Sequence, residues 1–176
     1  MTRLLDRLPH EHVREATRAI PPPARTVLIA TDGTPSSRAA VERGLALAQE
    51  LDTRVTFVSA YRPPWGALGE PHYQRSLSKR LARAREALAE AKAAADAFGA
   101  DADYEIVEGR PALAIARLAA ARDVDLLVVG SRDLTRPAAA LCRSVSRSLV
   151  GRSDRAVLVA KDGRRSKSWT LRFLAA

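Results

Sequence analysis

The sequence predicts an α/β fold with a five-stranded parallel sheet flanked by helices on both faces. Five short apolar segments, rich in β-branched residues, alternate along the chain with helical segments. Strands that alternate with helices form parallel sheets, because the crossover helices pack on the two faces. The strand segments also lack a regular alternation of polar residues, which is typical of strands that are buried on both sides. We therefore expect a three-layer α/β/α domain.

Each element is predicted from its own residues. The expected strands cover residues 26–31, 54–61, 102–109, 125–130 and 156–160. The expected helices lie between the first two strands as far as Leu51, from Ser76 to Phe98, from Pro111 onward, and from Ser144 to Gly151. Pro35 and Pro111 stand where an early helical proline is favoured. Thr34, Ser36 or Ser37 can cap the first helix. Residues 62–75, which contain several prolines and glycines, predict a long loop.

One domain of residues 25–162 accounts for most of the 176 residues. Residues 1–24 are expected to be an N-terminal extension that ends in a stiff proline linker. Residues 163–176 are expected to be a basic C-terminal tail. The N-terminus does not resemble a secretory signal, and no stretch approaches the roughly 20 apolar residues of a membrane span. We therefore expect a cytoplasmic protein without a membrane partner.

The formal net charge of +9 favours anionic partners such as nucleotides, nucleic acid or anionic lipid, without choosing between them. The abundance of arginine and alanine is equally consistent with a compositional habit of the source genome. The single cysteine, Cys142, excludes an internal disulfide. No grouping of histidine, cysteine or carboxylate residues predicts a structural metal, and no catalytic triad spacing is present. The sequence therefore points to binding and does not predict an enzyme, although a slow ATPase is not excluded.

Two loops carry the candidate site, because ligands of parallel sheets bind where the strand order reverses at the carboxyl ends of the strands. Asp32 follows the first strand, and its carboxylate can accept hydrogen bonds from ribose hydroxyls or an adenine amine. Its alternative role is that of a turn residue, since Asp-Gly is common in turns. Gly130 closes the fourth strand, where a glycine allows close backbone approach to a ligand or a positive φ.

Polar residues that follow the fourth strand could complete an anion site. Ser131 and Arg132 offer a hydroxyl and a guanidinium. Ser144 and Ser146 lie at the start of the last expected helix, where free N–H groups and the helix dipole favour an anion. Ser144 is equally explained as a helix cap. Arg136 and Arg143 could add positive charge to the same loop.

Taken together, these segments resemble the universal stress protein family. The resemblance rests on TVLIATDGTPSSRAAVERGLALAQEL, RVTFVSAY, EGRPALAIARLA and DLLVVGSRDLTRPAAALCRSVSRSLVGRSDRAVLVAK, and it covers about residues 25–161. It implies a Rossmann-like fold, similar to that of the adenine nucleotide alpha hydrolases. It also implies a homodimer that forms through the last strand, residues 156–160. Some members of the family bind ATP and others do not.

The resemblance implies specific nucleotide contacts in this chain. Carried over position by position, they fall on Ala30, Thr31, Asp32, Ala60, Val129, Gly130, Ser131, Arg132, Ser144, Val145 and Ser146. The family's ATP-binding pattern, G-x2-G-x9-G-[ST], begins here at Gly130 and ends at Ser144. Asp133 and Arg143 stand at its second and third glycine positions. A carboxylate beside a triphosphate is unfavourable, since like charges about 4 Å apart repel by a few kcal/mol even near a surface.

Two functional hypotheses follow. The first is a dimeric stress-response regulatory module that binds ATP or another adenine nucleotide through a degenerate phosphate loop. The second is an adaptor that binds a protein or nucleic acid partner through the dimer surface and the basic tails.

Overall fold

The computed structural model describes residues 26–64, 69–131, 145–161 and 170–172. Its sheet has the order β3-β2-β1-β4-β5-β6. The strands are β1 (Thr26–Ala30), β2 (Arg54–Tyr61), β3 (Ala102–Glu108), β4 (Leu126–Ser131), β5 (Ala156–Lys161) and β6 (Thr170–Arg172). All neighbours from β3 to β5 pair in parallel, and β6 alone pairs antiparallel. The prediction of a five-stranded parallel sheet is confirmed, with one short strand added to it.

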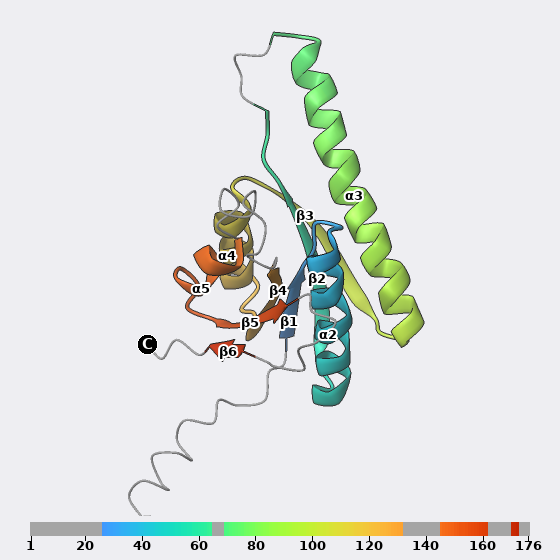
Figure 1. The fold of residues 1–176 in the computed structure, drawn as a ribbon, viewed down its shortest axis with the longest axis vertical. Helices are drawn as coiled ribbons and strands as arrows, with labels where there is room; N and C mark the ends of the chain where they lie inside the picture. The colour runs from blue at the N-terminus through green and yellow to red at the C-terminus, as the bar shows by residue number, and fades with distance from the viewer. Residues whose placement is uncertain (1–25, 65–68, 132–144, 162–169, 173–176) are drawn as a thin grey trace, which may run out of the picture.

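Helices cover both faces of this sheet. They are α2 (Pro35–Leu51), α3 (His72–Phe98), α4 (Pro111–Ala121) and α5 (Val145–Val150). Figure 1 shows α2 and α3 on one face and α4 and α5 on the other. The start of α3 was predicted four residues too late, at Ser76. The residues from His72 to Arg75 contain no proline or glycine, so the helix extends back to Pro71, and the expected 62–75 loop is correspondingly shorter.

The core consists of two apolar layers, because successive strand residues point to opposite faces of the sheet. Val27 and Ile29 of β1 belong to the layer beneath α2 and α3. Leu28 and Ala30 of the same strand belong to the layer beneath α4 and α5. Leu28, Ile29 and Phe57 are completely buried. This arrangement explains the continuous apolar character of the strands in the sequence.

The sixth strand was not predicted. Residues 170–172 fall in the segment assigned to the basic tail, and they pair with Val157, Leu158 and Val159 of β5. Three residues are too few to show a strand pattern in a sequence. Their pairing occupies the outer edge of β5, the strand through which the family resemblance implies dimerisation. The N-terminal extension lies outside the described residues, as does most of the tail.

Candidate functional site

The strand order reverses between β1 and β4, since β2 and β3 follow on one side of β1 and β5 follows β4 on the other. Ile29 of β1 pairs with Val128 of β4, and Ala30 pairs with Val58 of β2. The structure thereby brings seven of the predicted contact residues to the carboxyl ends of the strands. They are Ala30, Thr31, Asp32, Ala60, Val129, Gly130 and Ser131. Ligands of parallel sheets bind at this end of the strands.

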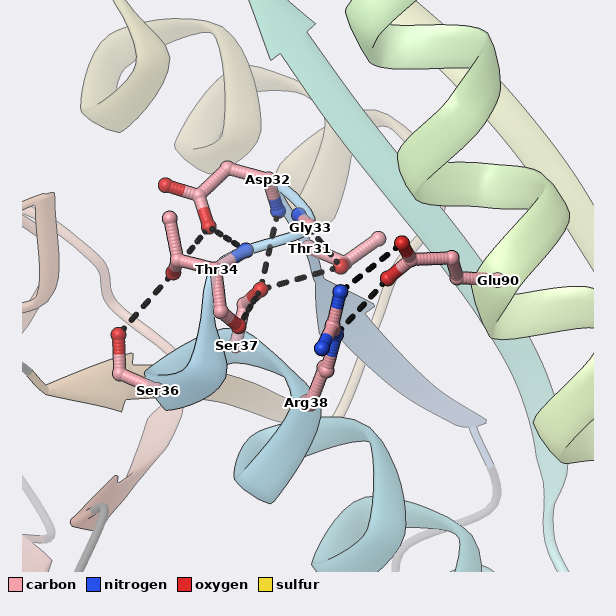
Figure 2. A network of polar contacts seen from close by, with 8 residues as sticks. All are labelled: Thr31, Asp32, Gly33, Thr34, Ser36, Ser37, Arg38 and Glu90. Atoms are coloured by element: carbon pink, nitrogen blue, oxygen red, sulfur yellow. Dashed lines mark hydrogen bonds and ion pairs between the residues drawn. The ribbon is translucent and has the colours of Figure 1, made fainter.

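The turn between β1 and α2 is organised around the buried hydroxyl of Ser37 (Figure 2). Ser37 Oγ accepts hydrogen bonds from Thr31 Oγ1 and from the backbone N–H of Asp32, both at 3.3 Å. It donates to the carbonyl oxygen of Thr34 at 2.9 Å. One helical side chain thus holds the end of the strand against the start of the helix. The backbone of the candidate site is preorganised before any ligand arrives.

Asp32 takes part in the same turn through its carboxylate. Oδ1 accepts hydrogen bonds from Thr34 Oγ1 at 2.6 Å and from Thr34 N at 3.1 Å. Gly33 follows with a φ of 73°, a left-handed conformation that favours glycine. The alternative role considered for Asp32, that of a turn residue, is therefore present in the structure. The Asp32 side chain is nevertheless exposed at the carboxyl end of β1, where a ligand can reach it.

An ion pair ties the start of α2 to α3 behind this turn. The Arg38 guanidinium donates to Glu90 through Nε at 2.9 Å and through Nη2 at 3.0 Å (Figure 2). These hydrogen bonds raise the pKa of Arg38 above its ordinary value. Both side chains are substantially exposed, so the pair contributes little to stability. It connects the first turns of α2 to α3 at the surface.

Gly130 is required by packing, the positive φ considered for it is not observed, and its expected close approach to a ligand stays a prediction. A methyl group at this position would overlap the Ser36 carbonyl oxygen and lie 2.5 Å from the Ser36 carbonyl carbon. It would also lie 2.9 Å from the Ser37 nitrogen. The close approach is thus between the end of β4 and the first turn of α2. Gly130 is not among the positive-φ glycines of the described residues, which are Gly33, Gly99 and Gly109.

The far side of the candidate site is only partly described. Ser146 of α5 is buried, whereas the neighbouring Val145 is exposed. Arg132, Ser144, Asp133, Arg136 and Arg143 lie outside the described residues. The assignment of nucleotide contacts to this side stays a prediction.

Sequence reasoning missed the part played by Ser37, which it considered only as a helix cap. Thr34 is the residue at the cap position, and its side chain makes no capping hydrogen bond. The signal in the sequence was the pair of adjacent serines at the start of the helix, both of which are buried. Within the described ranges, no group of three or more His, Cys, Asp or Glu side chains is placed to hold a metal. No described helix is long and apolar enough to cross a bilayer.

Comparisons with known proteins agree on one family. Residues 23–161 match the family model described as "Universal stress protein family". A universal stress protein of Thermus aquaticus, encoded in the 3′ region of a QAH/OAS sulfhydrylase gene, is 34% identical over 137 residues. That alignment covers 78% of this chain and 98% of the relative.

Solved structures have the same fold. The crystal structure of a universal stress protein in complex with cAMP is 29% identical, with a TM-score of 0.64. The match covers 81% of this chain and all of that one. A universal stress protein family member from Arabidopsis thaliana, solved with AMP bound, has a TM-score of 0.62 at 18% identity. It covers 79% of this chain and 92% of the Arabidopsis chain, and it shows the fold alone.

Proposed function

The chain belongs to the universal stress protein family, and from that premise we propose that it is a stress-response regulatory module that binds an adenine nucleotide. The nucleotide would lie at the carboxyl ends of β1 and β4. The chain would act by binding and not by turnover, because the described part of the site offers neither a metal-binding group nor a histidine as general base.

The observation that carries the proposal is the exposed Asp32 carboxylate beside the reversal in strand order. A carboxylate accepts hydrogen bonds from ribose hydroxyls and from an exocyclic amine. The Ser37 network holds the backbone of Thr31 and Asp32 in place, so little ordering is needed on binding. The cAMP complex of a relative that is 29% identical supports an adenine nucleotide as the ligand class.

We further propose that ligands with one phosphate bind more tightly than ATP. Asp133 and Arg143 replace two glycines of the family's ATP-binding pattern. If the family pattern holds at this position, the Asp133 carboxylate would add a negative charge close to a triphosphate, and each 1.4 kcal/mol of repulsion lowers affinity about tenfold. A single phosphate carries less charge into that loop. ATP binding as tight as that of AMP would show that Arg143 neutralises the loop.

Calorimetric titration of nucleotide-stripped protein with ATP, AMP and cAMP, with and without magnesium, tests the proposal. We expect micromolar binding of at least one monophosphate, and its loss in Asp32→Ala. Asp101→Ala is the matched control, because Asp101 is an exposed carboxylate at the amino end of β3, whereas the proposed site lies at the carboxyl ends of the strands. Binding that survives in Asp32→Ala would refute the site. Absence of binding in the unaltered chain would favour the adaptor hypothesis.

A homodimer is also part of the proposal. Because β6 pairs with the outer edge of β5, two copies cannot join these edges directly while β6 remains in place. A dimer on this side must therefore include β6 or displace it. Light scattering of the full chain and of a chain that ends at Lys161 distinguishes the two arrangements from a monomer.

A further inference from the structure

Three arginines line one hollow on the surface, at the carboxyl ends of β2 and β3 and beside the candidate nucleotide site. The hollow is lined by Arg62, Pro63, Pro64, Arg80, Gly109 and Arg110. Arg62 follows β2, Arg80 belongs to α3, and Arg110 precedes the first turn of α4. All three are exposed, and none of the described residues that line the hollow is acidic. Three separate elements thus converge to place positive charge at one point.

The walls of this hollow are fixed by hydrogen bonds. Arg80 Nη1 donates to the Arg62 carbonyl oxygen at 2.9 Å. The Gly109 N–H donates to the Tyr61 carbonyl oxygen at 2.9 Å, and Tyr61 Oη donates to Glu108 Oε2 at 2.7 Å. The ends of β2 and β3 are therefore joined twice beside the hollow. The nearby Glu108 carboxylate already accepts a hydrogen bond from Tyr61.

The charge of these arginines is not neutralised within the described structure. Ion pairs between described residues join Arg38 to Glu90, Lys92 to Asp96, Arg122 to Glu105 and Arg155 to Asp123. None of them involves an arginine of the hollow. Three guanidinium groups that line one hollow and have no carboxylate partner within ion-pair distance favour an anion there.

Further positive charge lies on α3, where Arg83 is one turn away from Arg80. Buried residues of this helix begin only at Ala84, and Figure 1 shows its N-terminal half extending beyond the sheet. Residues 72–85 contain five basic side chains and no acidic one. Arg75, Lys79 and Arg83 are exposed and spaced by four residues, so they form one row about 12 Å long. This shape suits an extended polyanion better than a single phosphate.

We propose that the hollow and the row Arg75, Lys79 and Arg83 bind the phosphate backbone of a nucleic acid. Arginine forks bind phosphate oxygens in pairs, and a row of cations follows successive phosphates. A membrane surface fits less well, because a basic helix binds it strongly only when electrostatic attraction is combined with apolar side chains that insert between lipids. The large apolar side chains exposed in the described residues are Leu51, Phe98, Leu113 and Val145, none of them on the projecting half of α3.

A charge-matched pair of variants tests this proposal. Arg62→Gln/Arg110→Gln removes two charges from the hollow but keeps the Arg62 carbonyl oxygen that Arg80 contacts. Arg54→Gln/Arg152→Gln is the control. It removes two exposed charges near the amino ends of β2 and β5, whereas the hollow lies at the carboxyl ends of β2 and β3. Binding to a labelled 20-nucleotide strand, alone and as a duplex, is measured by fluorescence anisotropy between 50 and 200 mM salt. Thermal unfolding confirms that both variants are folded.

For a single strand, each phosphate that the protein no longer neutralises lowers the slope of log K against log salt by about 0.7, so two lower it by about 1.4. Over this fourfold salt range, that change corresponds to about a sevenfold smaller decrease in affinity. We expect this effect in the hollow variant and a near-normal slope in the control. Equal effects in both variants would overturn the proposal in favour of net charge alone. Binding to vesicles with anionic lipid but not to nucleic acid would overturn it in favour of a membrane.

The Asp32→Ala variant separates this proposal from the nucleotide site. Asp32→Ala should leave nucleic acid binding unchanged, whereas it should abolish binding of adenine nucleotides. A chain that binds neither strand nor duplex at 50 mM salt would refute this inference and leave the proposed function standing.

Discussion

Replacing Gly130 by alanine should destabilise the fold, because the added methyl group meets backbone atoms on the first turn of α2. The group would overlap the Ser36 carbonyl oxygen and lie 2.5 Å from the Ser36 carbonyl carbon. Backbone atoms of a helix cannot rotate away as the end of a side chain can. Overpacking in a well-packed interior costs about 1–3 kcal/mol, and this geometry belongs at the upper end, near 3 kcal/mol.

The expected loss of stability can be measured as a melting temperature. At about 3 °C per kcal/mol for a domain of this size, Gly130→Ala should melt about 9 °C lower than the unaltered chain. Gly151→Ala is the control, since a methyl group there would meet the Arg147 carbonyl oxygen at an ordinary 3.7 Å. Scanning calorimetry or circular dichroism of the two variants gives the comparison.

Gly130→Ala also separates the two explanations of this glycine. If Gly130 served mainly to admit a ligand, the variant would keep its melting temperature and lose nucleotide affinity. If packing requires it, as the structure indicates, stability falls in the absence of any ligand. A melting temperature within about 2 °C of the unaltered chain would correspond to less than about 1 kcal/mol and would refute the packing argument.

Three further variants test other parts of the structure. Ser37→Ala removes a buried hydroxyl that makes three hydrogen bonds, and it should cost about 1–3 kcal/mol by urea denaturation, more than Ser36→Ala. The pKa of Tyr61 is raised above its ordinary value of about 10, mainly by the hydrogen bond to Glu108 and to a smaller extent by desolvation. The stability that Tyr61 gains over Tyr61→Phe should therefore be complete below about pH 10 and decline as pH rises through the folded-state pKa; a pH-independent difference would contradict this. Ending the chain at Lys161 removes β6 and leaves the outer edge of β5 unpaired, so self-association by light scattering should increase, and an unchanged mass would argue against an edge-covering role.

The regular elements could be predicted because their signals are local. Pro35 and Pro111 mark the first residues of α2 and α4 as expected, and the apolar runs place the five parallel strands to within one or two residues. The start of α3 was predicted too late because the prolines and glycines of the preceding loop suggested a longer irregular segment. Strand β6 has three residues and depends on an edge that only the assembled sheet provides.

The places of Asp32 and Gly130 in the fold were predicted from the sequence, but their contacts were not. Strands that alternate with helices run parallel, so Asp32 and Gly130 could both be placed at the carboxyl ends of strands without coordinates. The neighbours of each residue could not be predicted in this way. Gly130 faces the backbone of Ser36, about 94 positions away in the chain, and no local pattern signals such a contact. The three arginines of the hollow are likewise far apart in sequence and meet only in the fold.

Family membership does not decide the ligand here, because the chain keeps the family's fold but departs from its ATP-binding pattern. Among the described residues, both apolar layers are built from the strands and from α2 to α5. Two glycine positions of that pattern hold Asp133 and Arg143 in this chain, which still matches the family model over residues 23–161. The turn after β1 is different, because Thr31 and Ser37 serve the fold and the proposed site together. We therefore expect the adenosine end of the site to be retained with the fold and the phosphate end to vary independently, which is why the titration compares ligands that differ only in their phosphates.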